Sequence, residues 1–215
     1  MPSELSRLTH LRLLSLSHND LTGTLPDLHK LTGLEYVDLG TNQLSGDLPN
    51  WINAWSHLKV MGFENNLLAG ELPPALAELT ELKTLDFKKN LLKGGIDVVD
   101  KMPNLEYLYL SHNGFASYID PDSFLVGIDS IQELDISNNL FYGDVFPRQL
   151  LNKPNLKLLD ISANALRGSL PDLNSTNSVL EVLEINANGF TGTIPSSIEK
   201  LVNLKHLDMQ MVGSS

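Results

Sequence analysis

The sequence contains no cysteine, few aromatic residues and far fewer basic than acidic side chains. Its 215 residues include 7% aromatics, and 15 Lys and Arg stand against 26 Asp and Glu, a net charge of −11. The missing cysteines exclude a disulfide framework and a thiolate metal site. The acidic balance argues against nucleic-acid binding, which needs clustered basic side chains to contact phosphates.

Long apolar runs are also missing. No stretch approaches the roughly 18–20 consecutive apolar residues of a membrane-spanning helix, so we expect no span in this chain. The first residues, Met1-Pro2-Ser3-Glu4, show neither the basic nor the apolar part of a signal peptide.

Leucine is what the sequence has in excess, with 43 residues, and it recurs in a fixed frame. Residues 11–26 read LRLLSLSHNDLTGTLP, residues 34–49 read LEYVDLGTNQLSGDLP, and residues 58–73 read LKVMGFENNLLAGELP. The asparagine of this frame returns at intervals of 23 to 26 residues. It occupies positions Asn19, Asn42, Asn66, Asn90, Asn113, Asn139, Asn164 and Asn188.

Within each unit, apolar residues alternate with other residues at period two, which predicts a short strand with one buried face. Leu14 and Leu16 are expected to point inward, and equivalent strands are expected to stack into a parallel sheet over a continuous core. The frame asparagines are expected to face inward too, in a ladder whose amides satisfy backbone groups of adjacent coils.

This frame resembles the plant-type leucine-rich repeat, whose unit reads LxxLxxLxLxxNxLxGxIPxxLxxL. The resemblance implies an α/β repeat solenoid, a right-handed horseshoe with a parallel concave β-sheet and a convex side of short 3₁₀ turns and loops. We interpret residues 1–215 as a single domain. It comprises a partial repeat over 1–7, eight Asn-marked repeats over 8–200 and a truncated ninth over 201–215.

Two units depart from the frame. The interval after Asn113 is the longest, Ser117 takes the usual glycine position, and no proline directly follows Ile119. We expect a bulging convex segment there. In the unit after Asn90, residues 94–97 read GGID in place of Gly-x-Ile-Pro.

Neither end has the polar outer face of a capping repeat. This favours a fragment of a longer protein over a complete small protein, whose uncapped repeats would associate end to end. The cysteine pairs that extracellular members of the family usually carry in their caps are absent.

The middle strands differ most from the family consensus on the predicted concave face. Exposed tyrosines flanked by charges are typical of protein and peptide hot spots. The alternative is a scatter of ordinary surface residues. The candidate ligand-binding residues are Tyr36, Val60, Glu64, Lys88, Tyr107, Tyr109 and His112, with Lys89 beside them.

Acidic residues occupy the same position on four neighbouring predicted strands, at Asp135, Asp160, Glu184 and Asp208. A functional interpretation is a cation or basic partner. We favour a solvated consensus feature, in which serines and two lysines, Lys157 and Lys205, ease the repulsion.

Other candidates are weaker. Trp55 takes a leucine position and is expected in the core, whereas Trp51 is a candidate for exposure. Asn174 begins the single N-glycosylation sequon, expected on a convex loop if the protein is secreted. The six histidines include no pair at metal-ligand spacing on one helix, and no phosphate loop, nucleophile elbow or kinase signature is present, so we expect no metal, no cofactor and no catalytic residue.

We therefore expect a non-catalytic module that recognises a protein or peptide on its concave face. The resemblance suggests the ligand-sensing region of a receptor-like protein or kinase at the cell surface, with span and kinase domain outside this chain. One alternative is a secreted inhibitor similar to those of cell-wall hydrolases such as polygalacturonase. The other is an intracellular scaffold, cytoplasmic and complete as written.

Overall fold

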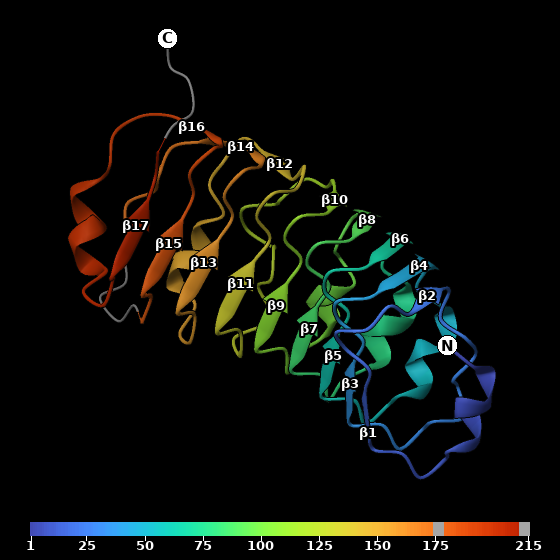
Figure 1. Cartoon of the computed structure of the whole chain (residues 1–215). Helices are drawn as coiled ribbons and strands as arrows, with labels where there is room; N and C mark the ends of the chain where they lie inside the picture. Colours follow the sequence, from blue (N-terminus) through green and yellow to red (C-terminus); the bar gives the residue numbers. More distant parts are fainter. Residues whose placement is uncertain (174–178, 211–215) are drawn as a thin grey trace.

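The chain winds into an elongated solenoid in which each repeat forms one coil (Figure 1). The computed structural model describes residues 1–173 and 179–210. Strands from successive coils follow one another in chain order from one end of the molecule to the other. Within these two ranges, no helix has the length and apolar character needed to cross a membrane.

In the described part of the chain, nine short strands, each from a different coil, form one parallel sheet along the molecule. They are β1 (Leu13–Ser15), β3 (Tyr36–Asp38), β5 (Val60–Gly62), β7 (Thr84–Asp86), β9 (Tyr107–Tyr109), β11 (Glu133–Asp135), β13 (Leu158–Asp160), β15 (Val182–Glu184) and β17 (His206–Asp208). Neighbouring strands pair without offset, so that Leu14, Val37 and Met61 lie side by side. The predicted parallel concave sheet is confirmed.

The central residue of each concave strand points into the core. From β1 to β15 this residue is at most 5% exposed, whereas Leu207 in β17 is 42% exposed because no described coil packs beyond it. The buried leucines, isoleucines and phenylalanines form one continuous cluster through the solenoid. Stacking thus removes from water the apolar side chains that a single coil leaves exposed.

Short strands on a second side of the solenoid form two further parallel sheets, which the repeat frame did not predict. The five-stranded sheet comprises β2 (Thr22–Gly23), β4 (Gln43–Asp47), β6 (Leu67–Gly70), β8 (Leu91–Gly94) and β10 (Gly114–Phe115). The three-stranded sheet comprises β12 (Tyr142–Gly143), β14 (Ala165–Gly168) and β16 (Gly189–Phe190). We call this second side the lateral side.

The convex side consists of loops and short 3₁₀ helices, as predicted. The helices of the described residues are η1 (Ser3–Arg7), η2 (Asn50–Ala54), η3 (Pro74–Glu78), η4 (Val99–Lys101), η5 (Arg148–Asn152) and η6 (Ser196–Lys200). A proline immediately precedes several of them, for example Pro49 before η2 and Pro195 before η6. Proline suits this place because the backbone N–H that it lacks would have no partner at a helix start.

The frame asparagines bridge each coil to the one before it. The Nδ2 atom of Asn66 donates to the carbonyl oxygen of Leu39 in the preceding coil at 3.0 Å, and its Oδ1 accepts the N–H of Leu44 at 2.9 Å. The other residues with this pattern are Asn42, Asn90, Asn113, Asn139, Asn164 and Asn188. Among the described residues, the ladder therefore runs from side chain to backbone and not from amide to amide.

Asn19 does not belong to this arrangement. Its side chain is exposed, and Nδ2 donates only to carbonyl oxygens of its own coil, those of Leu16 and Ser17. Placing Asn19 in an inward ladder was wrong, because the described structure offers it no coil on that side to bond.

The unit after Asn113 departs from the regular coil. Residues 121–127 form turns in place of a 3₁₀ helix, and the lateral strands are interrupted between β10 and β12. One isolated bridge, between Tyr118 and Tyr142, joins the two sides of this break. The neighbouring coil supports the segment, since Lys153 is buried and its Nζ donates to the carbonyl oxygen of Val126 at 3.1 Å.

The two tryptophans lie together at η2, Trp51 within the helix and Trp55 directly after it. Trp55 is fully buried and its indole N–H donates to the Leu28 carbonyl oxygen at 3.3 Å. Trp51 is partly buried, and its ring meets that of Trp55 edge to face at 5.4 Å. The core position expected for Trp55 is confirmed. The Asn174 sequon lies outside the described residues.

Candidate functional site

The outward-facing side chains of the concave sheet form rows that cross the strands. The first row, at the first residue of each strand, comprises Leu13, Tyr36, Val60, Thr84, Tyr107, Glu133, Leu158, Val182 and His206. The middle row, at the third residue, comprises Ser15, Asp38, Gly62, Asp86, Tyr109, Asp135, Asp160, Glu184 and Asp208. The far row, two residues after each strand, comprises Ser17, Gly40, Glu64, Lys88, Ser111, Ser137, Ser162, Asn186 and Gln210.

Apolar side chains gather in the first row. Tyr36 and Val60 are neighbours in the sheet register, and Thr84 separates Val60 from Tyr107. All three candidates, Tyr36, Val60 and Tyr107, are partly exposed. The strands hold them on a rigid surface, because the central residue of each strand is anchored in the core.

Lys88 and Tyr109 are already engaged with their neighbours. Lys88 Nζ lies 2.9 Å from Asp86 Oδ2 and 5.2 Å from the centroid of the Tyr109 ring, a cation–π contact. The Tyr109 hydroxyl donates to Glu133 Oε2 at 2.5 Å. Burial, aided by the Glu133 carboxylate, raises the pKa of Tyr109 far above its usual range. Lys88 and Tyr109 form one preorganised cluster with Asp86 of β7 and Glu133 of β11.

Glu64 lies over a glycine-lined hollow. Its carboxylate fills the space where a side chain at position 40 would begin, and Gly62 lies next to it. Burial raises the pKa of Glu64, and the carboxylates of Asp86 and Asp38 raise it further. Asp38 is satisfied locally, since it accepts hydrogen bonds from the Gly40 N–H and the Ser17 hydroxyl.

The four acidic residues predicted on neighbouring strands are register neighbours. Asp135 pairs with Asp160, Asp160 with Glu184, and Glu184 with Asp208. Serines satisfy two of them, because the Ser137 hydroxyl donates to Asp135 at 2.7 Å and the Ser162 hydroxyl to Asp160 at 2.6 Å.

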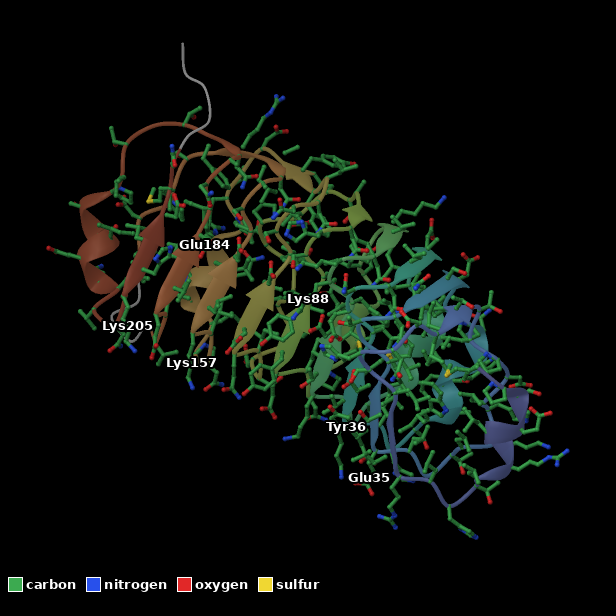
Figure 2. The ribbon with its side chains drawn as sticks, viewed as in Figure 1. Glu35, Tyr36, Lys88, Lys157, Glu184 and Lys205 are labelled. Atoms are coloured by element: carbon green, nitrogen blue, oxygen red, sulfur yellow. The ribbon has the colours of Figure 1, made fainter. Side chains whose placement is uncertain are left out.

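The lysines expected to ease this repulsion lie elsewhere. Lys157 and Lys205 occupy an edge row, at the residue before each strand, and Glu35 belongs to the same row towards the N-terminal end of the solenoid (Figure 2). Lys205 pairs with Glu181 at 2.6 Å. The expectation that Lys205 offsets the middle-row acids was wrong, because its ammonium group pairs with Glu181, the edge residue of the preceding coil.

This edge row is an ion-pair ladder that the sequence reasoning missed. Glu35 lies 2.7 Å from both Arg12 and Lys59, and Lys83 lies 2.7 Å from Glu106. The signal was available, since charged residues precede most of the concave strands at the repeat interval. These exposed pairs contribute little stability.

His112 does not lie on the strand face with the tyrosines. It is exposed and occupies the turn before the frame asparagine, with φ of 55°. Lys89 holds the equivalent place one coil earlier, with φ of 56°. Placing His112 on the concave face was wrong, because the chain has already turned away from the sheet there.

The described residues contain no group of three or more His, Asp or Glu side chains placed to hold a metal ion. What this surface offers chemically is apolar contact area, hydroxyl groups and carboxylates on a rigid sheet. These groups are suited to the recognition of another molecule.

Comparison with known families identifies the repeats. Family models described as "Leucine Rich repeats (2 copies)" and "Leucine Rich Repeat" match residues 9–53, and residues 104–125 and 179–201. The chain thus contains leucine-rich repeats. The matched segments lie near both ends and in the middle of the same continuous concave sheet.

Related leucine-rich-repeat sequences come from receptor-like proteins of Arabidopsis thaliana. Receptor-like protein 36 is 38% identical over 115 residues, which are 53% of this chain and 16% of that protein. Receptor-like protein 39 is 32% identical over 102 residues, 47% of this chain and 12% of that protein. The alignments thus span less than a fifth of the length of these relatives.

Solved structures of plant receptors share the fold of this leucine-rich-repeat chain. The plant peptide hormone receptor RGFR1 in complex with RGF2 has a TM-score of 0.89 and 27% identity, over 98% of this chain and 34% of that one. PEPR1 with AtPEP1 has a TM-score of 0.88 and 26% identity, over 98% of this chain and 30% of that one. The chain therefore resembles part of a receptor ectodomain.

Proposed function

We propose that this chain is the ligand-sensing repeat region of a receptor-like protein, and that it binds a peptide along its concave face. The observation that carries the proposal is the row formed by Tyr36, Val60 and Tyr107, partly exposed on strands whose other face is locked in the core. Tyrosines held in this way supply contact area at little cost in conformational entropy.

The comparisons support a peptide as the ligand. RGFR1, a plant peptide hormone receptor, was solved in complex with RGF2, and the Arabidopsis receptor kinase HAESA was solved with the peptide hormone IDA; they match 98% and 96% of this chain. An extended peptide laid across the strands would meet Tyr36 and Tyr107 in turn, since both belong to the same row.

A phage-displayed library of random short peptides, selected on the immobilised chain, tests this proposal. Selected peptides are then titrated against wild type, Tyr36→Ala and Tyr107→Ala by fluorescence anisotropy. We expect each substitution to weaken binding by about fivefold to thirtyfold, the range of hot-spot residues. Melting curves should stay close to wild type, because neither ring is part of the buried core.

Tyr142→Ala is the matched control. Tyr142 is 51% exposed but lies on β12, on the lateral side. Equal loss of binding in Tyr142→Ala, or no loss in either concave variant, would contradict recognition on the concave face.

A further inference from the structure

The concave face carries negative charge almost without compensation. Among the described residues of its first, middle and far rows, Lys88 is the sole lysine or arginine. The carboxylates of these rows belong to Asp38, Glu64, Asp86, Glu133, Asp135, Asp160, Glu184 and Asp208. Cationic side chains gather instead in the edge row, where Arg12, Lys59, Lys83 and Lys205 pair with glutamates.

The charge of these carboxylates is met mostly by neutral donors. Within the described part of the chain, the ion pairs to them come from Lys88, to Asp86 at 2.9 Å, and from His206, to Glu184 at 3.5 Å. Hydroxyl and backbone N–H groups satisfy Asp38, Asp135 and Asp160. The face therefore keeps a negative potential that a cationic partner would complement.

The spacing of the carboxylates in the middle row indicates which backbone conformation a bound cationic peptide would have. Asp38, Asp86, Asp135 and Glu184 stand on β3, β7, β11 and β15, every second strand of the sheet, and Asp160 on β13 and Asp208 on β17 add carboxylates between and beyond them at one end of the row. Strands about 4.8 Å apart place the carboxylates of every second strand about 10 Å apart along the row. Three residues of a polyproline II helix cover about 9 Å and return to the same face.

An extended β-strand does not meet this spacing. Its side chains alternate with period two, so that residues three apart point to opposite faces. A polyproline II peptide, by contrast, presents every third side chain to the row. Tyr36 and Tyr109 lie beside Asp38 and Asp86, and aromatic rings of this kind are what prolines pack against.

We propose that the concave face binds a cationic peptide in the polyproline II conformation, with Lys or Arg at every third position facing the middle-row carboxylates. This inference rests on the proposed function, peptide binding on the same face. Because Lys88 already pairs with Asp86 and His206 with Glu184, the strongest contacts are those to Asp38 and Asp135.

Two fluorescein-labelled peptides of identical composition test the proposal. One consists of four Lys-Pro-Pro triplets, and the other has its four lysines contiguous, followed by the prolines. We expect the triplet peptide to bind more tightly. Asp38→Asn and Asp135→Asn should each weaken that binding by about two- to fivefold, as expected for a solvent-exposed charge pair.

Asp144→Asn, at an exposed position beside β12, is the matched control for the loss of one negative charge. Equal affinity of the two peptides, or equal effects of Asp144→Asn and Asp135→Asn, would overturn the inference. If the selected library peptides bind at Tyr36 and Tyr107 and neither lysine peptide binds, the inference fails while the proposed function stands. If no peptide of any kind depends on the concave face, both fail.

Discussion

The Nδ2 atom of Asn90 donates to the carbonyl oxygen of Phe63, one coil earlier in the solenoid, at 2.9 Å. In the same amide, Oδ1 accepts the N–H of Leu68 at 3.0 Å, and Nδ2 also reaches the Phe87 carbonyl oxygen of its own coil. One buried side chain thereby satisfies backbone groups of two coils at the point where the chain leaves the concave sheet.

Replacing the amide of Asn90 should therefore lower the stability of the fold. Asn90→Ala leaves the N–H of Leu68 and the Phe63 carbonyl oxygen buried without partners, and we expect a loss of about 1–3 kcal/mol in the free energy of unfolding. Chemical denaturation monitored by circular dichroism gives the measurement. Asn19→Ala serves as control and should cost less, because Asn19 is exposed and bonds only within its own coil. Equal losses in the free energy of unfolding for Asn90→Ala and Asn19→Ala would contradict the role of the buried amide as a bridge between coils.

Leu85 tests the inward direction of the concave strands. It is fully buried at the centre of β7, and Leu85→Ala should lower the free energy of unfolding by about 2–5 kcal/mol through the cavity that it creates. Leu13, 59% exposed at the start of β1, provides the same substitution on the outward face. A Leu13→Ala variant as unstable as Leu85→Ala would contradict the assignment of the two faces.

A substitution at Gly168 tests whether the backbone of the lateral side requires glycine at this position. Its φ is 101°, and a Cβ atom there would lie 2.7 Å from the carbonyl oxygen of Asp144. We expect Gly168→Ala to destabilise the protein by roughly 1–3 kcal/mol, from strained backbone and the close contact. At Gly127 the nearest atom to an added Cβ lies 4.0 Å away, so Gly127→Ala should change the melting temperature little. Similar melting temperatures for the two variants would argue against this strain.

We expect the stability of the protein to depend on pH through the carboxyl group of Asp160. Burial raises its pKa and the Asp135 carboxylate adds to the rise, although hydrogen bonds from Ser162 oppose it. Asp160 thus holds its proton more tightly in the folded than in the unfolded chain. The stability that it contributes is present below the unfolded pKa of about 3.9 and is lost as the pH rises through the folded pKa.

Asparagine at position 160 cannot ionise and keeps an oxygen to accept from Ser162. The melting temperature of Asp160→Asn, relative to wild type, should therefore be higher at about pH 7 than at about pH 3. Asp144→Asn controls for the change in net charge. A relative melting temperature of Asp160→Asn that is highest at the acidic end would reverse the predicted sign.

The central architecture was predictable because it is encoded locally and repeated. The alternation around Leu85 defines a strand with one buried face, and recurrence of the frame makes such strands stack. The buried position of Trp55 followed from the leucine position that it occupies. The lateral sheets did not follow, because their strands are defined by backbone pairing between coils and carry no alternation of their own.

In the candidate site, too, some features could be predicted from the sequence and others could not. Tyr36 and Tyr107 could be placed on the concave face by counting from the inward leucines. The contacts of Lys88 with Asp86 and with the Tyr109 ring could not, since they depend on side-chain conformations across neighbouring coils. His112 was misplaced because the chain turns one residue before Asn113, where periodicity no longer applies.

By itself, the sequence determined the repeat, the inward residues and the side of the sheet that remains exposed, because all three depend on spacing within one coil. Which residues of different coils meet was decided only by the tertiary structure. Glu35 pairs with both Arg12 and Lys59, and Asn19 stays exposed while Asn90 is buried. Residues more than twenty positions apart become neighbours only when the coils stack, so their pairing is a property of the packed solenoid.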